Sequence, residues 1–178
     1  ETVNQQSLIV GDKYIVVMSG GVDHVGLDGA GLLWGTGSTG LTVDENGANA
    51  YIKYKNAYDK FWNEERRTKA AAVHLTPAEV TTLASIVEKE VIRDKELPTV
   101  AGVYLNRLKI NMPLQADPTL VFALRDFDAR RVNQYHKEFD SPYNTYLYAG
   151  LPPGPICMPR KKSIDAVLNF EEHKFLYF

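Results

Sequence analysis

The stretch Leu75-Thr-Pro-Ala-Glu-Val-Thr-Thr-Leu-Ala-Ser-Ile-Val-Glu-Lys-Glu90 decides how the rest of the chain is interpreted. It opens with the signals of a helix N-terminus. Thr76 is a good N-cap, Pro77 suits the first helical position, and Glu79 completes a capping box. At about 100° per residue, the apolar side chains fall on one broad face: Val80, Leu83, Ala84, Ile86, Val87 and Val91. The sequence therefore predicts an amphipathic helix that begins at Pro77.

Glu90 is unusual because it falls inside this apolar arc, whereas Lys89 faces solvent and Glu88 lies just outside the edge. Burying a carboxylate disfavours its charged form and raises its pKa unless a cation or several donors offset the cost. A carboxylic acid that keeps its proton near neutral pH can donate that proton to a leaving group. The alternative is structural, with Glu90 turned outward at the helix end and paired with Arg93 or Lys95.

A second helix is predicted from Leu97 to about Ile110, with Pro98 in its first turn. Apolar residues cover most of its circumference, so this helix should be buried. Arg107 falls in the same arc, which suggests that it pairs with Glu90 or shares a polar pocket with it. The alternative is a lone ion pair that only holds the two helices together.

Two more helices and two rigid loops are expected after residue 110. Asp117-Pro118 predicts an N-cap followed by proline, with a short helix to about Leu124. Ser163 is predicted to cap a last helix over 164–169. Between these helices, the loops 141–146 and 150–156 are constrained by proline and rich in polar groups, as binding loops commonly are. We expect both loops beside Glu90. The final apolar run, residues 175–178, is typical of a strand.

Residues 1–48 differ in character from the rest. A short strand is predicted over 14–18 from its β-branched residues, and nine of the 13 glycines lie between Gly20 and Gly47. A nucleotide-binding module is one interpretation of this strand and the glycines. Their spacing does not match a dinucleotide fingerprint, and no Gly-Lys-Ser/Thr follows. The alternative is a set of β-hairpins or a loose loop.

Composition excludes several classes of protein. The 22 acidic and 20 basic residues nearly cancel, which argues against a nucleic-acid partner. Cys157 is the only cysteine, so the chain has no internal disulfide and no cysteine-based metal cluster. No apolar run reaches the roughly 18 residues that a membrane span needs, and no signal peptide is present.

Five motifs occur in a fixed order: Ala84-Ser-Ile-Val-Glu-Lys-Glu90, Val103-Tyr-Leu-Asn-Arg-Leu108, Met112-Pro-Leu-Gln-Ala-Asp-Pro-Thr119, Tyr143-Asn-Thr-Tyr146 and Gly150-Leu-Pro-Pro-Gly-Pro-Ile156. Together they resemble the MltG (YceG-like) endolytic murein transglycosylase family of bacteria over about residues 50–178. We therefore expect an α+β fold in which a helix-rich catalytic domain with a small β-sheet, 49–178, follows an unassigned Gly-rich β/loop segment, 1–48. The resemblance also implies that the chain ends before a further strand and a histidine-containing segment.

The resemblance implies an enzyme, a lytic transglycosylase that cleaves peptidoglycan glycan strands internally. Such an enzyme breaks the MurNAc–GlcNAc β-1,4 bond without water and leaves a 1,6-anhydro-MurNAc end. The catalytic glutamate of the family falls on Glu90, which would act first as general acid and then as base. One carboxylate suffices because the C6 hydroxyl of the sugar attacks the anomeric carbon. No metal or organic cofactor is required.

The resemblance and the polar loops suggest a set of substrate-binding residues: Asn106, Arg107, Gln115, Asp117, Tyr143, Asn144, Thr145 and Tyr146. Their alternative role is loop and cap structure. The implied partners are glycan strands and peptidoglycan synthases. The implied location is the bacterial cell membrane, reached through an N-terminal anchor absent from this chain, with the catalytic domain on the periplasmic or extracellular face. The alternative function is a non-catalytic glycan-binding or cell-wall-synthesis scaffold module of the same fold, which solvent exposure of Glu90 would favour.

Overall fold

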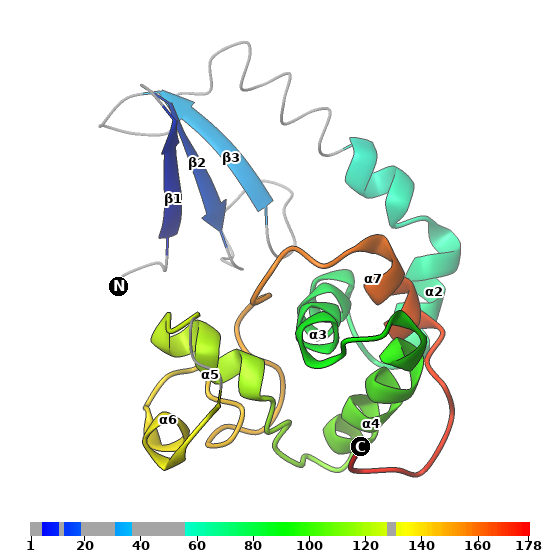
Figure 1. Cartoon of the computed structure of the whole chain (residues 1–178). Coiled ribbons are helices and arrows are strands. Elements are labelled where there is room, and N and C mark those ends of the chain that lie inside the picture. The colour runs from blue at the N-terminus through cyan, green and yellow to red at the C-terminus, as the bar shows by residue number, and fades with distance from the viewer. Residues whose placement is uncertain (1–4, 11–12, 19–30, 37–55, 128–130) are drawn as a thin grey trace. The chain divides into compact units, whose positions relative to one another are not determined.

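The computed structural model describes the backbone of residues 5–10, 13–18, 31–36, 56–127 and 131–178, and the side chains of the last two ranges (Figure 1). The chain divides into two compact units, Glu1–Thr68 and Lys69–Phe178. The domain boundary predicted between residues 48 and 49 lies outside the described residues and stays a prediction.

The first unit contains a three-stranded antiparallel sheet in the order β1-β2-β3, formed by β1 (Gln5–Val10), β2 (Lys13–Met18) and β3 (Gly31–Thr36). The β-branched run predicted as a strand over 14–18 corresponds to β2. Most of the glycine-rich stretch, 19–30 and 37–47, lies outside the described residues, so the nucleotide-binding interpretation is not tested. Residues 56–61 are helical and precede α2 (Glu64–Ala72).

The second unit is built from helices: α3 (Pro77–Glu90), the short 3-10 helix η1 (Asp94–Glu96), α4 (Leu97–Lys109), α5 (Asp117–Leu124), α6 (Gln134–Glu138) and α7 (Lys161–Leu168). Within 56–127 and 131–178 no residue forms a strand, so the small β-sheet expected in the catalytic domain was wrong. The terminal strand expected over 175–178 was also wrong. The backbone carbonyls of His173, Phe175 and Leu176 accept hydrogen bonds from side chains of α4 instead of from a neighbouring strand.

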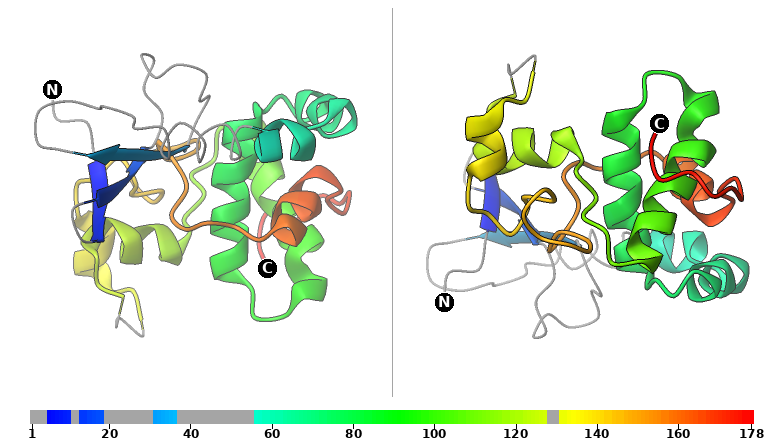
Figure 2. Two further views of the ribbon diagram at one scale, coloured as in Figure 1. Left: turned by 90° about the horizontal axis from the view of Figure 1, so that it is seen from above. Right: turned by 90° about the horizontal axis from the view of Figure 1, so that it is seen from below.

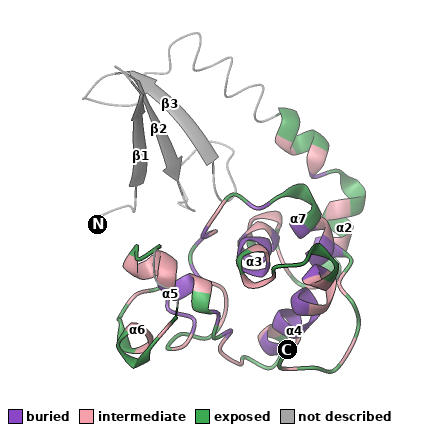
Figure 3. Cartoon of the chain, viewed as in Figure 1, coloured by how far each residue is buried: buried purple, intermediate pink, exposed green. Residues whose placement is uncertain are grey.

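Helix α3 begins as predicted, with both halves of the capping box formed. The Glu79 amide donates to Thr76 Oγ1 at 3.2 Å, and the Thr76 amide donates to Glu79 Oε2 at 2.7 Å. The helix packs against α4, α5 and α7. It lies between α5 on one side and α4 with α7 on the other, as Figures 1 and 2 show from three directions. This central position explains why its residues from Thr82 to Val87 are all buried (Figure 3).

Helix α4 runs from Leu97 to Lys109, within one residue of the predicted span, and most of its residues are buried. Arg107 is among them, with 6% of its surface exposed. The C-terminal segment, residues 170–178, is hydrogen-bonded along this helix. The Glu171 amide donates to the Pro98 carbonyl at 3.1 Å, and the Asn106 amide group donates to the carbonyls of His173 and Phe175.

Both later helix caps were predicted at the wrong residue. Helix α5 has Ala116 as its N-cap and Asp117 as its first residue, and α7 begins at Lys161 with Ser163 already inside it. In each case the side chain has a tertiary partner. Asp117 accepts the hydroxyl of Tyr146, and the Ser163 hydroxyl donates to Glu88 Oε2 at 2.8 Å. These long-range hydrogen bonds replace the local caps that the sequence pattern suggests.

In the part of the chain that the structure describes, no single helix has both the length and the apolar character to cross a bilayer. Helices α2 and α3 meet these criteria only as a pair, and they are bent by 76° at the break between them.

Gly102 should be intolerant of a side chain. A Cβ atom there would lie 2.5 Å from the Glu171 carbonyl oxygen and 2.7 Å from His173 Nε2. Alanine is favoured over glycine inside a helix by about 1 kcal/mol, but overpacking a tight contact costs about 1–3 kcal/mol. We expect Gly102→Ala to lower the free energy of unfolding, measured by urea denaturation. If the free energy of unfolding instead rose by about 1 kcal/mol, as helix propensity alone predicts, the C-terminal segment would not pack against α4 this closely.

Candidate active site

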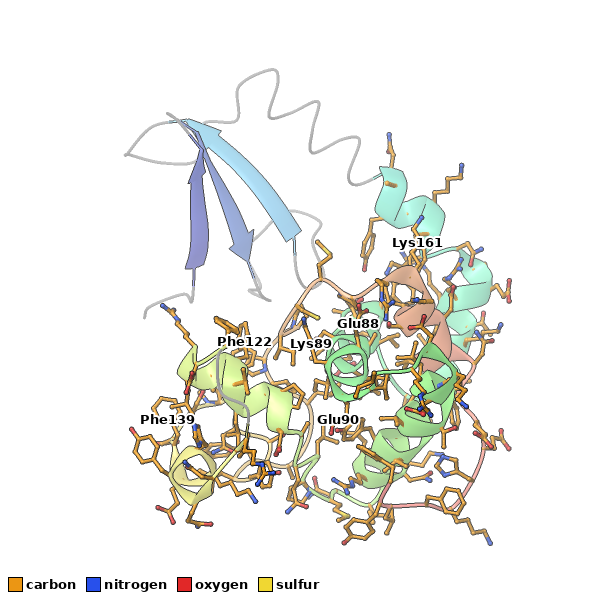
Figure 4. All side chains as sticks on the ribbon, in the orientation of Figure 1. Glu88, Lys89, Glu90, Phe122, Phe139 and Lys161 are labelled. Atoms are coloured by element: carbon orange, nitrogen blue, oxygen red, sulfur yellow. The ribbon has the colours of Figure 1, made fainter. Side chains whose placement is uncertain are left out.

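Glu90 is the last residue of α3, and its side chain is half-buried. Among the buried polar side-chain atoms that the structure describes, Glu90 Oε2 is the one without a hydrogen-bond partner. Figure 4 shows Glu90 and Glu88 on opposite sides of α3, with Glu88 toward α7 and Glu90 away from it. An unpartnered buried carboxyl oxygen is costly in a folded protein and needs an explanation. The outward-turned, ion-paired Glu90 is therefore not what the structure shows.

The surroundings of Glu90 raise the pKa of its carboxyl group above the usual value. Burial is the largest cause, because it disfavours the charged form. A hydrogen-bonding interaction with the Tyr104 hydroxyl lowers the pKa, the negative charge of Asp117 raises it, and the positive charge of Arg107 lowers it. The net shift is upward, so Glu90 keeps its proton to a higher pH than a solvated glutamate does.

Glu88, two residues earlier, has the opposite electrostatic environment. Its carboxylate accepts hydrogen bonds from the Arg160 amide at 2.7 Å, Arg160 Nε at 2.6 Å and the Ser163 hydroxyl at 2.8 Å. Burial raises the pKa of Glu88, but the hydrogen bonds from Arg160 and Ser163 outweigh this effect, and the pKa is lowered. Two neighbouring glutamates thus differ in protonation because their surroundings differ. Glu88 is suited to an ion pair and Glu90 to an acid.

Arg107 does not form the predicted ion pair with Glu90, since none joins them among the residues described. Its Nε donates to the Leu176 carbonyl at 2.7 Å, and its Nη1 donates to the Leu114 carbonyl. The guanidinium also lies 5.1 Å from the ring centroid of Tyr177. Arg107 therefore joins α4 to two other segments, and it influences Glu90 through its charge alone.

Asp117 and Tyr146 form a hydrogen-bonded pair near Glu90. The Tyr146 hydroxyl donates to Asp117 Oδ1. Burial raises the pKa of Tyr146, and so do its hydrogen bond to Asp117 and the charges of Asp117 and Glu90. The phenol consequently stays protonated and remains a donor. Through Tyr146, the predicted loop 141–146 interacts electrostatically with Glu90.

Other predicted substrate-binding residues support this loop instead of presenting free polar groups. The buried Asn144 side chain donates to the carbonyls of Lys137 and Phe139 and accepts from the amides of Tyr146 and Leu147. The Tyr143 ring packs against Phe122, with 4.8 Å between the centroids. Thr145 is also buried and bonds to the start of α5.

The structure also describes two further predicted residues, Asn106 and Gln115, and the second predicted loop. The Asn106 side chain holds the C-terminal segment. Gln115 is exposed and has a left-handed backbone conformation with φ 50°. Its backbone N–H donates to the Thr145 carbonyl at 2.9 Å. Loop 150–156 attaches to α3 at Ser85, where the Ile156 amide donates to Ser85 Oγ at 3.0 Å. Within the described residues, no hydrogen bond links this loop to Glu90.

Tyr104 is a site residue that sequence reasoning missed. It is 1% exposed, and its hydroxyl interacts with Glu90. Burial and the charge of Glu90 both raise the pKa of Tyr104, so the phenol remains a neutral donor. The available signal was a tyrosine on a face that is otherwise aliphatic, because a buried phenol usually needs a polar partner.

We expect the two glutamates to have opposite effects on stability. Because native Glu90 keeps its proton to higher pH than the unfolded chain does, the wild type loses stability as pH rises from about 4.5 through the native pKa. Glu90→Gln removes this loss, so its stability advantage should grow with pH. Urea unfolding of both proteins from pH 4 to pH 8 measures this difference.

Glu88→Gln is the matched control for that experiment. The stability from its hydrogen bonds is present above about 4.5 and is lost as pH falls through the lowered native pKa. The variant should be less stable at neutral pH by about 1 kcal/mol, since Arg160 is 47% exposed. A Glu90→Gln protein less stable than the wild type at pH 8 would contradict the assigned environment of Glu90.

The arrangement just described was compared with known proteins. Residues 42–178 match the model of the YceG-like family. The chain is 38% identical over 129 residues to the endolytic murein transglycosylase of Bacillus subtilis (strain 168), which covers 72% of this chain and 34% of that protein. It is 35% identical over 109 residues to the endolytic murein transglycosylase of Streptococcus pneumoniae (strain D39), which covers 59% of this chain and 20% of that protein.

A solved structure agrees with these sequence matches. The crystal structure of a yceG-like protein from Listeria monocytogenes superposes with a TM-score of 0.62 and 31% identity, over 82% of this chain and 46% of that one. The chain therefore spans less than half the length of the relatives it matches. Because the family match extends over most of the chain, from residue 42 to its end, the protein belongs to the YceG-like family.

Proposed function

We propose that this chain carries the catalytic glutamate of an endolytic peptidoglycan lytic transglycosylase, and that this glutamate is Glu90. The observation that carries the proposal is the half-buried Glu90 carboxyl, with a raised pKa and an oxygen that has no partner. Glu90 is also the residue on which the family motif places the catalytic acid. The relatives named as endolytic murein transglycosylases support the reaction class.

The reaction needs one carboxyl group that gives and then regains a proton. Protonated Glu90 donates its proton to the glycosidic oxygen between MurNAc and GlcNAc, and the bond from that oxygen to the anomeric carbon breaks. The C6 hydroxyl of the same MurNAc attacks the anomeric carbon, and its proton passes to the Glu90 carboxylate. The products are a 1,6-anhydro-MurNAc end and a free GlcNAc 4-hydroxyl. No water is consumed, and Glu90 returns to its protonated form.

The unpartnered oxygen fits this role because a general acid must present its proton to the substrate. Oxygen Oε2 has no competing hydrogen bond among the described residues. Burial keeps the carboxyl group protonated before cleavage, and the nearby Arg107 charge assists the carboxylate form afterwards. The Tyr104 hydroxyl, from α4, interacts with the same carboxyl group and favours its ionised form. Together, burial, Arg107 and Tyr104 allow the Glu90 carboxyl group to alternate between its protonated and ionised forms.

The residues around Glu90 also suggest where sugars bind. Tyr146 and Asp117 offer polar groups whose electrostatic interactions reach the acid, and the Gln115 side chain, two residues before Asp117, is exposed. Asn144, Thr145 and Tyr143 have their polar or aromatic groups engaged with residues of α5 and α6, which favours a supporting role for them. The scaffold alternative gives no reason for an unpartnered carboxyl at this position. The synthase partners and the membrane location stay predictions.

The proposal is tested with Glu90→Gln in the intact protein. Glutamine keeps the shape of the side chain but has no proton to donate, so the yield of anhydro ends should fall at least about 10²-fold. Mass spectrometry of muropeptides released from purified glycan strands measures this yield, and a thermal melt of the same preparation confirms folding.

Glu88→Gln serves as the matched control, because it makes the same substitution on the same helix two residues away. Its activity per folded molecule should stay close to that of the wild type. If Glu90→Gln retains activity while Glu88→Gln loses it, the acid role passes to Glu88.

A further inference from the structure

A half-buried lysine packs on the predicted binding loop 141–146. Lys137, in α6, holds its ammonium group 4.8 Å from the centroid of the Tyr146 ring. Among the residues that the structure describes, no carboxylate forms an ion pair with it. An aromatic face attracts a cation but does not neutralise its charge. The positive charge of Lys137 is therefore available to a ligand.

The acidic residues in this part of the fold have other partners. Glu138 and Asp140, which follow Lys137 closely in the chain, each accept a hydrogen bond at 2.7 Å from a neighbouring amide group or hydroxyl. Asp117 accepts from the Tyr146 hydroxyl, at the edge of the ring whose face Lys137 covers. The ammonium group thus remains without a counter-ion although three carboxylates are nearby. This arrangement suits a site where the anion belongs to the ligand.

The backbone around Lys137 is fixed by the buried side chain of Asn144. Its Nδ2 donates to the carbonyls of Lys137 at 3.0 Å and Phe139 at 2.8 Å. Its Oδ1 accepts from the amides of Tyr146 and Leu147. The amide group uses all of its hydrogen-bonding capacity in this way and joins the end of α6 to the loop. The lysine and the ring are therefore held together before any ligand binds, which lowers the entropic cost of binding.

Lys137 lies one helix away from the helix that carries the candidate acid. Helix α6 contacts α5, and α5 contacts α3, which ends at Glu90; Figure 2 shows α5 between the other two. This position suits a substituent of the sugar better than the bond that is cleaved. The MurNAc sugars of peptidoglycan carry a lactyl group that ends in a carboxylate or in a peptide. A peptide of five residues extends up to about 18 Å, beyond the spacing of about 8–10 Å between packed helices.

Resting on the proposed function, we propose that Lys137 and Tyr146 form a subsite that binds a carboxylate of the MurNAc side chain. The ammonium group pairs with the carboxylate, and the Tyr146 ring holds the lysine side chain in place. The carboxylate is that of the lactyl group in strands without peptides, or that of the stem peptide in strands that carry one. The ion pair contributes to substrate binding and takes no part in bond cleavage.

A structural role for Lys137 makes a different prediction. If its charge only offsets that of Asp117 across the Tyr146 ring, Lys137→Met lowers the free energy of unfolding and weakens the enzyme equally toward every substrate. A binding role instead changes how the enzyme discriminates between substrates with and without carboxylates. The ratio of the two kcat/KM values separates these roles, because it does not depend on how much of the protein is folded.

The test uses purified glycan strands with their peptides and strands stripped of peptides by an amidase, each with and without its carboxylates blocked as methylamides. Blocking should lower the wild-type kcat/KM by about fivefold, the upper end for a partly exposed ion pair. The loss should appear in KM, because the contact is the same in the ground state and the transition state, and it should shrink as salt is added. An effect in the peptide-bearing strands identifies the stem peptide, and an effect in the stripped strands identifies the lactyl group.

Three variants sharpen this result. Lys137→Met keeps most of the aliphatic side chain but removes the charge, so blocking the carboxylates should no longer change kcat/KM. Lys137→Arg keeps both the charge and the contact with an aromatic ring, and it should retain the wild-type response. Lys109→Met is the matched control, because the ammonium group of Lys109 lies 5.6 Å from the centroid of the Phe170 ring at the end of α4. This variant should respond to blocking as the wild type does.

An equal response to blocking in the wild type and Lys137→Met overturns the proposal, and so does a wild type that ignores blocking in both kinds of strand. Binding separates this failure from failure of the proposed function. The Kd of Glu90→Gln for peptide-bearing and peptide-stripped glycan fragments is measured with and without Lys137→Met, and it should rise about fivefold for the fragment that carries the bound carboxylate. An active Glu90→Gln enzyme defeats the function. An inactive Glu90→Gln enzyme whose Kd values are unchanged by Lys137→Met defeats only the subsite.

Discussion

The structure depends on the burial of α3. This packing brings the side-chain carboxyl group of Glu90, the last residue of the helix, into the domain without a counter-ion. Packing against α4, α5 and α7 removes one whole face of this helix from water. The helix ends at Glu90, so the carboxyl group is partly desolvated by the same packing that stabilises the fold. A chemically useful carboxyl is thus a consequence of where the core helix stops.

The neighbouring elements adjust the electrostatics of this carboxyl and hold its surroundings in place. Arg107 satisfies its buried guanidinium with the carbonyls of Leu114 and Leu176, so it supplies charge near Glu90 without neutralising it directly. The same bonds connect α4 to the segment before α5 and to the C-terminal segment. Glu88 shows the contrast, because its close pairing with Arg160 keeps it ionised. Position on the helix separates the roles of the two glutamates.

Much of the helical part could be predicted from the sequence. Capping and periodicity located α3 and α4 within one residue, because their signals are local and agree with their burial. The expected strand over 175–178 failed because side chains of α4 bind its backbone. The caps expected at Asp117 and Ser163 failed for a related reason, since each side chain has a partner more than 25 positions away. Local sequence propensity carries no information about partners so far away in the chain.

The sequence by itself determined that a glutamate would stand on the buried side of a capped helix, since both capping and helical periodicity are local properties. Only the tertiary structure decided what surrounds that glutamate. It placed Tyr104 against Glu90, directed Arg107 to backbone carbonyls, and joined Asp117 to Tyr146. These relations link residues far apart in the chain, and the pKa of a carboxyl group depends on distances to such groups, which no local pattern specifies.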